Sequence, residues 1–191
     1  VIALLSFSAL SNNDKVGLIM FSDQLEKYLP PRKGRNKALE ILRDVLYLEP
    51  VHKNTSLLQA LTFANHILKK RSVWFILSDF MDSGYNKPLE ILAQKHDVIA
   101  IQILDEAELK LPDAGVLNLY DPETGDTLYC NTSVTSIQKA YEARVSKQQE
   151  DLAKDLAKMK VDYIMLRSMD SHIKALRTFF EQRRRRLREG R

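Results

Sequence analysis

The sequence has only one cysteine, Cys130, among its 191 residues. A single cysteine cannot form a disulfide within the chain, so the fold does not depend on a disulfide framework. This cysteine usage fits a reducing compartment, and we expect a cytoplasmic protein. The four histidines are scattered along the chain without the spacing of metal ligands, which argues against a zinc site.

Long apolar runs and linker-like segments are also absent. No stretch approaches the roughly 18 consecutive apolar residues that a membrane-spanning helix needs. The apolar start, Val1–Leu10, has no basic residues before it and no initiator methionine, so it resembles the middle of a helix more than a signal peptide. Without a linker or an internal repeat, a chain that is 45% hydrophobic predicts one globular domain over residues 1–191.

Positive charge is concentrated at one end of the chain. The net charge is +4, but the segment Arg183–Arg191 holds six arginines and one glutamate (+5), which leaves about −1 for the other residues. This segment can be a solvated helix end favoured by the helix dipole, a surface for an anionic protein or membrane, or a nucleic-acid contact. No aromatic residues lie between the arginines, so we expect no nucleic-acid partner.

The apolar pattern predicts alternating strands and helices. Buried strands are predicted at Val16–Ser22, Val73–Asp79, Val98–Asp105 and Val161–Arg167. Helical spacing of apolar residues predicts helices at Val1–Leu10, Arg35–Leu48, Leu58–Leu68, Lys87–Gln94 and Thr132–Lys160, and a final helix around Ile173–Phe180. This alternation indicates right-handed crossovers and a mostly parallel sheet.

Two exceptions to the parallel pattern are expected. Leu25–Leu29 follows the strand Val16–Ser22 after only Asp23 and Gln24, so these two strands should pair as an antiparallel edge. The turn cluster Asp121–Asp126 lies between two short strands, which predicts a small surface β-hairpin. In Thr132–Lys160 the apolar stripe repeats about every 3.67 residues, so we expect a nearly straight helix along the sheet.

The strongest functional signal is an apolar strand that ends in a carboxylate, Asp79. Ligands of open α/β sheets gather at the carboxyl ends of the strands, so Asp79 is a candidate ligand, or else a turn residue. Asp82 begins an Asp-Ser-Gly sequence that is typical of a turn. Asn54 and Thr55 precede a helix, where either residue can act as the helix N-cap.

The order of these segments resembles a von Willebrand factor A domain. The resemblance rests on the strand Lys15–Ser22, the loop Asn54–Leu61 and the strand end Phe75–Asp79. It implies a three-layer α/β sandwich with a Rossmann-like, mostly parallel sheet, flanking helices and a small β-hairpin insertion. It also implies that Thr55 and Asp79 belong to a metal-ion-dependent adhesion site (MIDAS).

Within that fold, the chain is most similar to the bacterial domain of unknown function 58 family, whose members are encoded beside MoxR-type AAA+ ATPases. The segments that carry this similarity are Asn12–Ile19, Ile76–Phe80, Val98–Asp105, Leu119–Asp126 and Asp162–Arg167. The similarity implies a MoxR-type ATPase and client proteins as partners.

The chain departs from the adhesion-site pattern at its beginning. The first motif of that site, Asp-x-Ser-x-Ser, is absent, because Ser6 and Ser8 have no aspartate before them. We therefore expect an N-terminally incomplete domain that lacks the first strand, which in this fold lies between Val16–Ser22 and Val73–Asp79. Strand edges left open by this loss would invite strand-mediated self-association.

The missing motif limits what the metal site can do. Mg²⁺ prefers near-octahedral oxygen ligation, and Thr55 and Asp79 offer only two protein oxygens. We expect Mg²⁺ or another divalent cation in the intact protein but none in this chain as given, with Asp105 as the first other candidate ligand. If Thr55 and Asp79 share one site, their side-chain oxygens should lie within about 8 Å of each other.

The sequence thus predicts a non-catalytic adaptor domain that binds proteins, with Asp82 and Asp105 as further candidates for partner contacts. The alternative is a Mg²⁺-dependent phosphotransfer or hydrolase centre built from Asp79, Asp82 and Asp105. No nucleophile–base pair accompanies these carboxylates, so we do not expect an enzyme.

Overall fold

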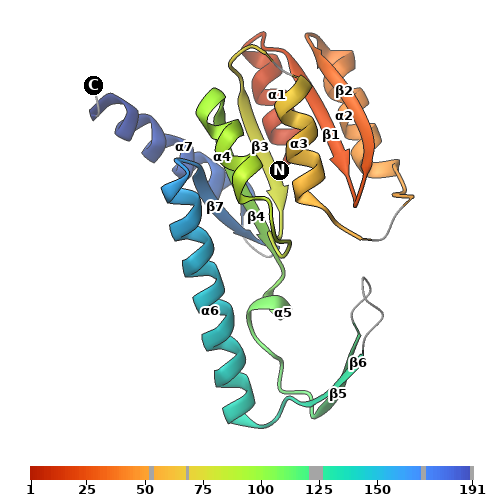
Figure 1. Cartoon of the computed structure of the whole chain (residues 1–191), viewed down its shortest axis with the longest axis vertical. Coiled ribbons are helices and arrows are strands. Elements are labelled where there is room, and N and C mark those ends of the chain that lie inside the picture. The colour runs from red at the N-terminus through yellow and green to blue at the C-terminus, as the bar shows by residue number, and fades with distance from the viewer. Residues whose placement is uncertain (52–53, 68, 121–126, 169–170, 190–191) are drawn as a thin grey trace. The chain divides into compact units, whose positions relative to one another are not determined.

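The computed structural model describes residues 1–51, 54–67, 69–120, 127–168 and 171–189. Figure 1 shows the helices and strands of the chain. The chain divides into two compact units. The first unit comprises Val1–Ile67 and Asp82–Pro88, and the second comprises Leu68–Met81 and Leu89–Arg191. No helix within these described ranges is both long enough and apolar enough to cross a membrane.

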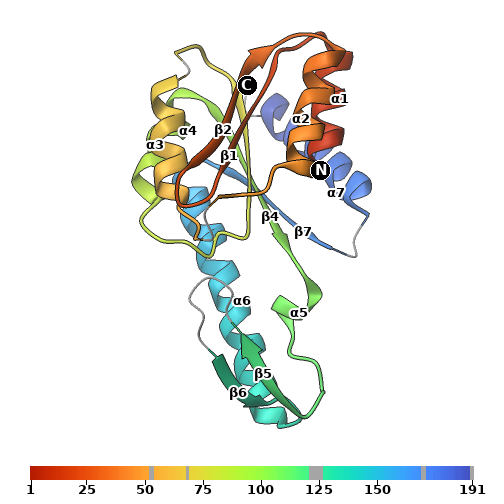
Figure 2. The same cartoon turned by 90° about the vertical axis from the view of Figure 1, so that its right-hand side faces the viewer.

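The first unit is built on an antiparallel pair of strands. Strand β1 (Val16–Phe21) pairs with β2 (Leu25–Arg32), which confirms the predicted edge hairpin. Its helices are α1 (Ile2–Ser11), α2 (Arg35–Tyr47) and α3 (Leu57–Ile67). Figure 2 shows α1 and α2 on one side of this pair and α3 on the other.

Close backbone approach shapes this strand pair. A Cβ on Gly17 would lie 2.8 Å from the carbonyl oxygen of Leu29 and 3.0 Å from the nitrogen of Pro31, so only glycine fits there. Strand β2 runs through Pro30 and Pro31, three residues past the predicted end at Leu29. This extension is compatible with the prolines because β2 is an edge strand.

A buried carboxylate joins α2 to β2. Asp44 is only 5% exposed and lies 2.8 Å from the Lys27 ammonium and 2.9 Å from the Arg43 guanidinium. Hydrogen bonds from Lys27 and then Arg43 lower the pKa of Asp44 below its usual value. The charge is therefore retained at neutral pH, and it fixes the buried face of α2 against the strand.

The second unit contains the parallel sheet. Its strand order is β3 (Val73–Ser78), β4 (Asp97–Leu104) and β7 (Asp162–Arg167), with both pairs parallel. The central strand β4 is buried along nearly its whole length, as its continuous apolar sequence predicts. The mixed α/β class and the parallel core are thus confirmed.

Helices flank this sheet. They are α4 (Asn86–Lys95), which leads into β4, α6 (Thr135–Lys158), which contacts β7, and α7 (His172–Glu189), which also contacts β7. On α7, the ring of Phe180 meets that of Phe75 edge to face, with 6.1 Å between the ring centroids. A short helix, α5 (Glu106–Leu109), and the hairpin strands β5 (Val116–Tyr120) and β6 (Thr127–Asn131) complete the unit.

The β5–β6 hairpin and the long helix α6 agree only in part with what the sequence predicts. The paired strands β5 and β6 confirm the predicted hairpin, whereas its turn, Asp121–Asp126, lies outside the described residues. In α6, Val145 and Leu156 are buried as expected. Ile137 is 37% exposed and Gln148 is exposed, so the stripe is not buried at these two positions of the helix.

Strands β1 and β3 each keep one edge without a strand partner among the described residues. In the sheets that these residues form, β1 is hydrogen-bonded only to β2, and β3 only to β4. The expectation of a further strand between β1 and β3 stays a prediction.

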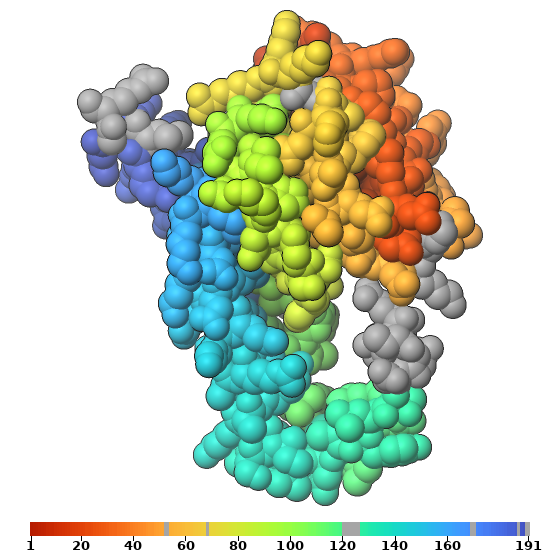
Figure 3. Space-filling model, in the orientation of Figure 1, coloured from red at the N-terminus to blue at the C-terminus, as the bar shows by residue number. Residues whose placement is uncertain are grey.

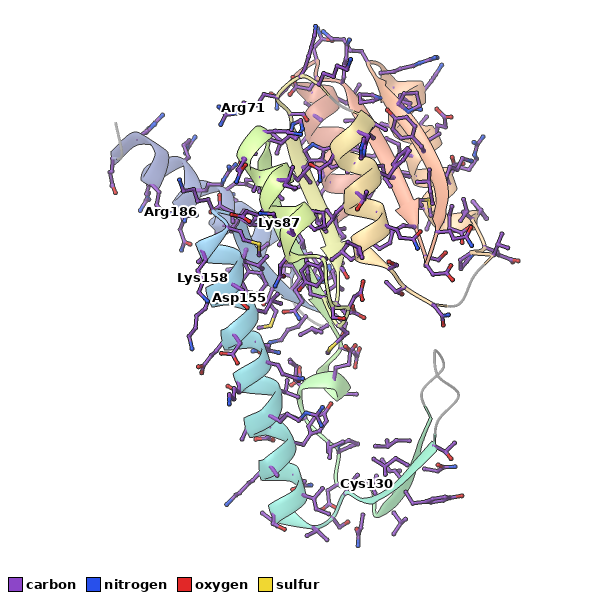
Figure 4. All side chains as sticks on the ribbon, viewed as in Figure 1. Arg71, Lys87, Cys130, Asp155, Lys158 and Arg186 are labelled. Atoms are coloured by element: carbon purple, nitrogen blue, oxygen red, sulfur yellow. The ribbon has the colours of Figure 1, made fainter. Side chains whose placement is uncertain are left out.

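The arginine segment is partly built into the second unit. Arg183 pairs with Asp97 and Asp162, the first residues of β4 and β7, and Arg186 lies 2.9 Å from Asp162. The Arg183 side chain is only 14% exposed. Burial by itself lowers the pKa of Arg183, but its hydrogen bonds to Asp97 and Asp162 raise it overall. The interpretation of this segment as a solvated helix end is therefore wrong for Arg183, whereas Arg184, Arg185 and Arg188 are exposed as that interpretation expects. Arg186 is labelled in Figure 4.

Replacing Arg183 with leucine should destabilise the second unit. Breaking a buried ion pair costs about 3–5 kcal/mol, but these carboxylates are still 31% and 24% exposed, so we expect about 2 kcal/mol. The measurement is urea unfolding followed by circular dichroism. The matched control is Arg184→Leu, because Arg184 is exposed and makes no ion pair with the described residues. Equal stability of the two variants would contradict a structural role for Arg183.

Candidate functional site

Asp79 directly follows β3 and presents an exposed carboxylate at the carboxyl edge of the parallel sheet. Its Oδ1 accepts a hydrogen bond from the backbone N–H of Met81 (3.1 Å), so it also forms the local turn that was the alternative interpretation. Its Oδ2 accepts no hydrogen bond from the described residues. One carboxylate oxygen therefore remains available to a ligand.

The backbone beside Asp79 is held in an uncommon conformation. Phe80 has a φ of +59° although it is not a glycine, and its side chain is only 7% exposed. The backbone N–H of Phe80 donates to the Ser78 hydroxyl (3.0 Å). Such strain persists only where the surroundings fix it, and it is frequent at functional sites.

A buried polar pair fixes this turn from the side of the sheet. Gln102 in β4 is 3% exposed, and its Nε2 donates to the carbonyl oxygen of Asp79 (2.8 Å). The hydroxyl of Tyr163 in β7 donates to Gln102 Oε1 (2.5 Å). Burial raises the pKa of Tyr163, so its hydroxyl keeps the proton that it donates. Sequence reasoning missed both residues, because each lies within an otherwise apolar strand.

The loop before α3 is fixed within the first unit. The backbone N–H of Ser56 donates to the carbonyl oxygen of Ser22 at the end of β1 (2.8 Å). The hydroxyl of Ser56 accepts from the N–H of Gln59, so Ser56 occupies the N-cap position of α3. The assignment of the cap to Asn54 or Thr55 is wrong. Both of these residues are exposed.

Asp82 lies at the same helix terminus. Its Oδ2 accepts from the N–H of Leu57, the first residue of α3 (2.6 Å), and its Oδ1 accepts from the N–H of Ser83. The carboxylate therefore does more than form the predicted turn, because it places negative charge at the positive end of the α3 dipole. Asp82 thus contacts Leu57, which follows Thr55 by two residues in the sequence.

Two further polar residues lie at this end of the first unit. Ser22 is 6% exposed, and its hydroxyl donates to Glu26 Oε1 (2.6 Å). The same Glu26 oxygen accepts from the N–H of Val51 (3.2 Å). Sequence reasoning did not select Ser22 or Glu26, since neither stands in a recognisable motif.

Asp105 also has a structural role, as the N-cap of a helix. It follows β4 and caps α5: its Oδ1 accepts from the N–H of Ala107 (3.0 Å), while Glu108 completes a capping box. Its Oδ2 accepts from the Ser168 hydroxyl (2.8 Å). The hydrogen bond from Ala107 and then that from Ser168 lower the pKa of Asp105. Both carboxylate oxygens thus already have donors.

The predicted proximity of Thr55 and Asp79 stays a prediction, because Thr55 belongs to the first unit and Asp79 to the second. Within the described residues, no group of three or more histidine, cysteine, aspartate or glutamate side chains is arranged to hold a metal ion.

Residues 1–151 match the family described as "Protein of unknown function DUF58". The chain belongs to the DUF58 family. It is 28% identical over 160 residues to the uncharacterized protein MAV169 of Mycobacterium avium, covering 82% of this chain and 94% of that protein. It is 27% identical over 126 residues to the uncharacterized protein Rv1480 of Mycobacterium tuberculosis, covering 64% of this chain but only 40% of that protein.

Two solved structures share the fold of this DUF58 protein. One is a conserved hypothetical protein, BatB from Bacteroides thetaiotaomicron, with a TM-score of 0.54 over 94% of this chain and 85% of that chain. The other is an aerotolerance-related membrane protein from Bacteroides fragilis with multiple mutations to serine, with a TM-score of 0.54 over 95% and 87%. Both are 16% identical to this chain, so the likeness concerns the fold alone.

Replacing Gln102 with leucine should destabilise the protein more than Tyr163→Phe. The first variant leaves both the Asp79 carbonyl and the Tyr163 hydroxyl without their partner, and each unsatisfied buried group costs about 1–3 kcal/mol. The second variant leaves only Gln102 Oε1 without its donor. Thermal unfolding by calorimetry measures both, and a larger effect of Tyr163→Phe would contradict this ranking.

Replacing Asp82 with alanine should destabilise α3. Loss of a side chain that accepts from the first N–H groups of a helix costs about 0.5–2 kcal/mol. Asp82→Asn keeps an acceptor oxygen and should recover most of this loss. Hydrogen exchange at the amide of Leu57 reports the change directly, and unchanged protection of that amide in Asp82→Ala would count against the contact.

Proposed function

We propose that this DUF58 protein is a non-catalytic adaptor domain with a von Willebrand factor A fold, which binds other proteins through a divalent cation at the carboxyl edge of its sheet. The observation that carries the proposal is the exposed Asp79 carboxylate at the end of β3, with Oδ2 available and its backbone fixed by Gln102. A ligand group that is rigid before binding loses little entropy when it binds.

The donor chemistry of the proposed site suits a hard cation. Asp79 supplies a carboxylate oxygen and Thr55 a hydroxyl oxygen, and Mg²⁺ prefers such oxygens together with several waters. Two protein oxygens are too few to hold Mg²⁺ specifically. A carboxylate from the partner protein would add a charged ligand, so partner and cation should bind together, each raising the affinity of the other.

The family resemblance suggests the partner. A MoxR-type AAA+ ATPase, with its client proteins, is the partner that we propose, in the cytoplasm and without nucleic acid. The enzymatic alternative, a Mg²⁺-dependent phosphotransfer or hydrolase centre, has less support because the carboxylates of Asp82 and Asp105 already accept hydrogen bonds at the starts of α3 and α5.

Complex formation with the purified MoxR-type ATPase of the same organism should require Mg²⁺. We expect binding, measured by biolayer interferometry, in about 5 mM Mg²⁺. Binding should be lost in EDTA, and Asp79→Ala should lower the affinity at least tenfold. Mg²⁺ alone should show no saturable binding to this chain by calorimetry.

The control variant is Asp14→Ala, which removes an exposed carboxylate from the loop between α1 and β1 and should leave binding unchanged. Mg²⁺-dependent hydrolysis of p-nitrophenyl phosphate or ATP by this chain alone, abolished in Asp79→Ala, would establish the enzymatic alternative instead. Binding that persists in EDTA would defeat the cation-dependent mechanism.

A further inference from the structure

Helix α2 of the first unit has one face that is exposed along its whole length. The side chains of this face, which we refer to as the α2 outer face, are Arg35, Leu39, Arg43, Leu46 and Tyr47. Leu39 is 46%, Leu46 is 75% and Tyr47 is 78% exposed, and both arginines are exposed as well. At 3.6 residues per turn, the five positions fall within about 120° of the helix circumference. They therefore form one continuous face.

The opposite side of α2 is buried in its own unit. The buried residues of the helix are Lys37, Ala38, Ile41 and Asp44, and the helix contacts α1 and β1. The same helical spacing places these four residues outside the α2 outer face. Figure 3 shows atoms of the orange segment that contains α2 at the surface of the first unit. A partner can therefore reach only about a third of the circumference of this helix.

The α2 outer face combines apolar and cationic side chains in a definite order. Counted around the helix from Arg35, Leu46 lies at about 20°, Leu39 at about 40° and Arg43 at about 80°, so the two leucines lie between the two arginines. No acidic residue belongs to this face. Long arginine side chains can extend their charged ends from an apolar strip toward a polar layer. An apolar strip flanked by arginines is typical of helices that lie in a membrane interface.

Positive charge is concentrated where β2 leads into α2. Arg32, Lys33 and Arg35 are exposed, and none of the described residues forms an ion pair with them. We refer to these three residues as the unpaired cations. The segment Arg32–Tyr47 holds five basic and two acidic residues, which gives a net charge of +3.

The two acidic residues of this segment do not neutralise the unpaired cations. The carboxylate of Glu40 lies 3.0 Å from the Lys37 ammonium. Asp44 is buried, and its carboxylate lies 2.8 Å from Lys27 and 2.9 Å from Arg43. Both carboxylates thus have other partners, so the unpaired cations are available to an anionic surface.

We propose that the α2 outer face docks onto an anionic membrane surface, with its leucines among the lipid headgroups and the unpaired cations on lipid phosphates. A nucleic acid would gain nothing from Leu39 and Leu46, because bases stack on aromatic side chains and only Tyr47 is aromatic. A protein groove receives an amphipathic helix by surrounding it, whereas α2 exposes only one side, which suits a flat surface. Each lysine or arginine near an anionic bilayer raises the affinity about fivefold.

This contact is independent of the cation-dependent site. It involves α2 and the residues that lead into it, whereas Asp79 follows β3. Membrane docking should therefore persist in EDTA and in Asp79→Ala. Failure of one proposal thus leaves the other intact.

The test is flotation of the full chain, in EDTA, with phosphatidylcholine vesicles that contain either about 30% phosphatidylglycerol or none. We expect the chain to bind the anionic vesicles at least about tenfold more tightly than the neutral ones. Binding should weaken at least fivefold in 0.5 M NaCl, where the Debye length falls to about 4 Å.

The double variant Lys33→Ser/Arg35→Ser should weaken binding to the anionic vesicles at least about tenfold, since it removes two of the unpaired cations. Its matched control is Arg184→Ser/Arg185→Ser, which removes two exposed arginines from α7 and should change the affinity less than about twofold. The substituted side chains of both variants are exposed, so the variants should fold, as circular dichroism will show.

The apolar part of the contact is tested separately. Leu46→Ser/Tyr47→Ser should weaken binding about fivefold, whereas Ile173→Ser, which removes an exposed apolar side chain (65%) from α7, should leave it unchanged. An environment-sensitive fluorophore attached to Leu46→Cys in a Cys130→Ser background should shift its emission to shorter wavelength on anionic vesicles. The same fluorophore attached to Ile173→Cys should not shift.

Several results would overturn the proposal. Equal binding to the two kinds of vesicle would do so, as would binding that is lost in the Arg184/Arg185 variant but kept in the Lys33/Arg35 variant, because α7 would then be the contact. An unshifted fluorophore at position 46 would show that the leucines do not reach the membrane. Tighter binding to a single-stranded oligonucleotide, or a dimer that Leu46→Ser/Tyr47→Ser dissociates in sedimentation equilibrium, would assign the face to nucleic acid or to a second copy.

Discussion

The pairing of β4 with β3 and β7 is the interaction on which the second unit depends. Strand β4 is buried on both faces, and its two ends carry the polar contacts that order the surroundings. At its start, Asp97 binds Arg183 and so attaches α7, while near its other end Gln102 holds the Asp79 turn. A residue change that shifted the register of β4 would therefore disturb both the helix and the candidate ligand.

The local sequence pattern was sufficient to predict the main strands and helices but not the contacts between them. Continuous apolar runs with turn residues after them identify β3 and β4, and hairpin spacing identifies β1 and β2. The partners of Gln102 and Asp82 could not be found in this way. Gln102 reaches Tyr163, 61 residues away, and Asp82 reaches Leu57, 25 residues away, and neither pairing leaves a periodic signal.

The net charge of a segment indicates how much charge it exposes only when its ion pairs are known. The six arginines near the end of the chain look like a uniform basic surface in the sequence, yet Arg183 and Arg186 neutralise carboxylates at the starts of β4 and β7. The segment around β5 and β6 differs, since it has acidic residues and no basic ones at all.

The edges of β1 and β3 that have no strand partner among the described residues set a physical condition on the adaptor proposal. A strand edge in contact with water costs little free energy, because water forms hydrogen bonds with its N–H and C=O groups. A buried unpaired group, in contrast, costs about 1–3 kcal/mol. Each edge must therefore be either hydrated or paired by another strand, and an unprotected edge recruits other chains.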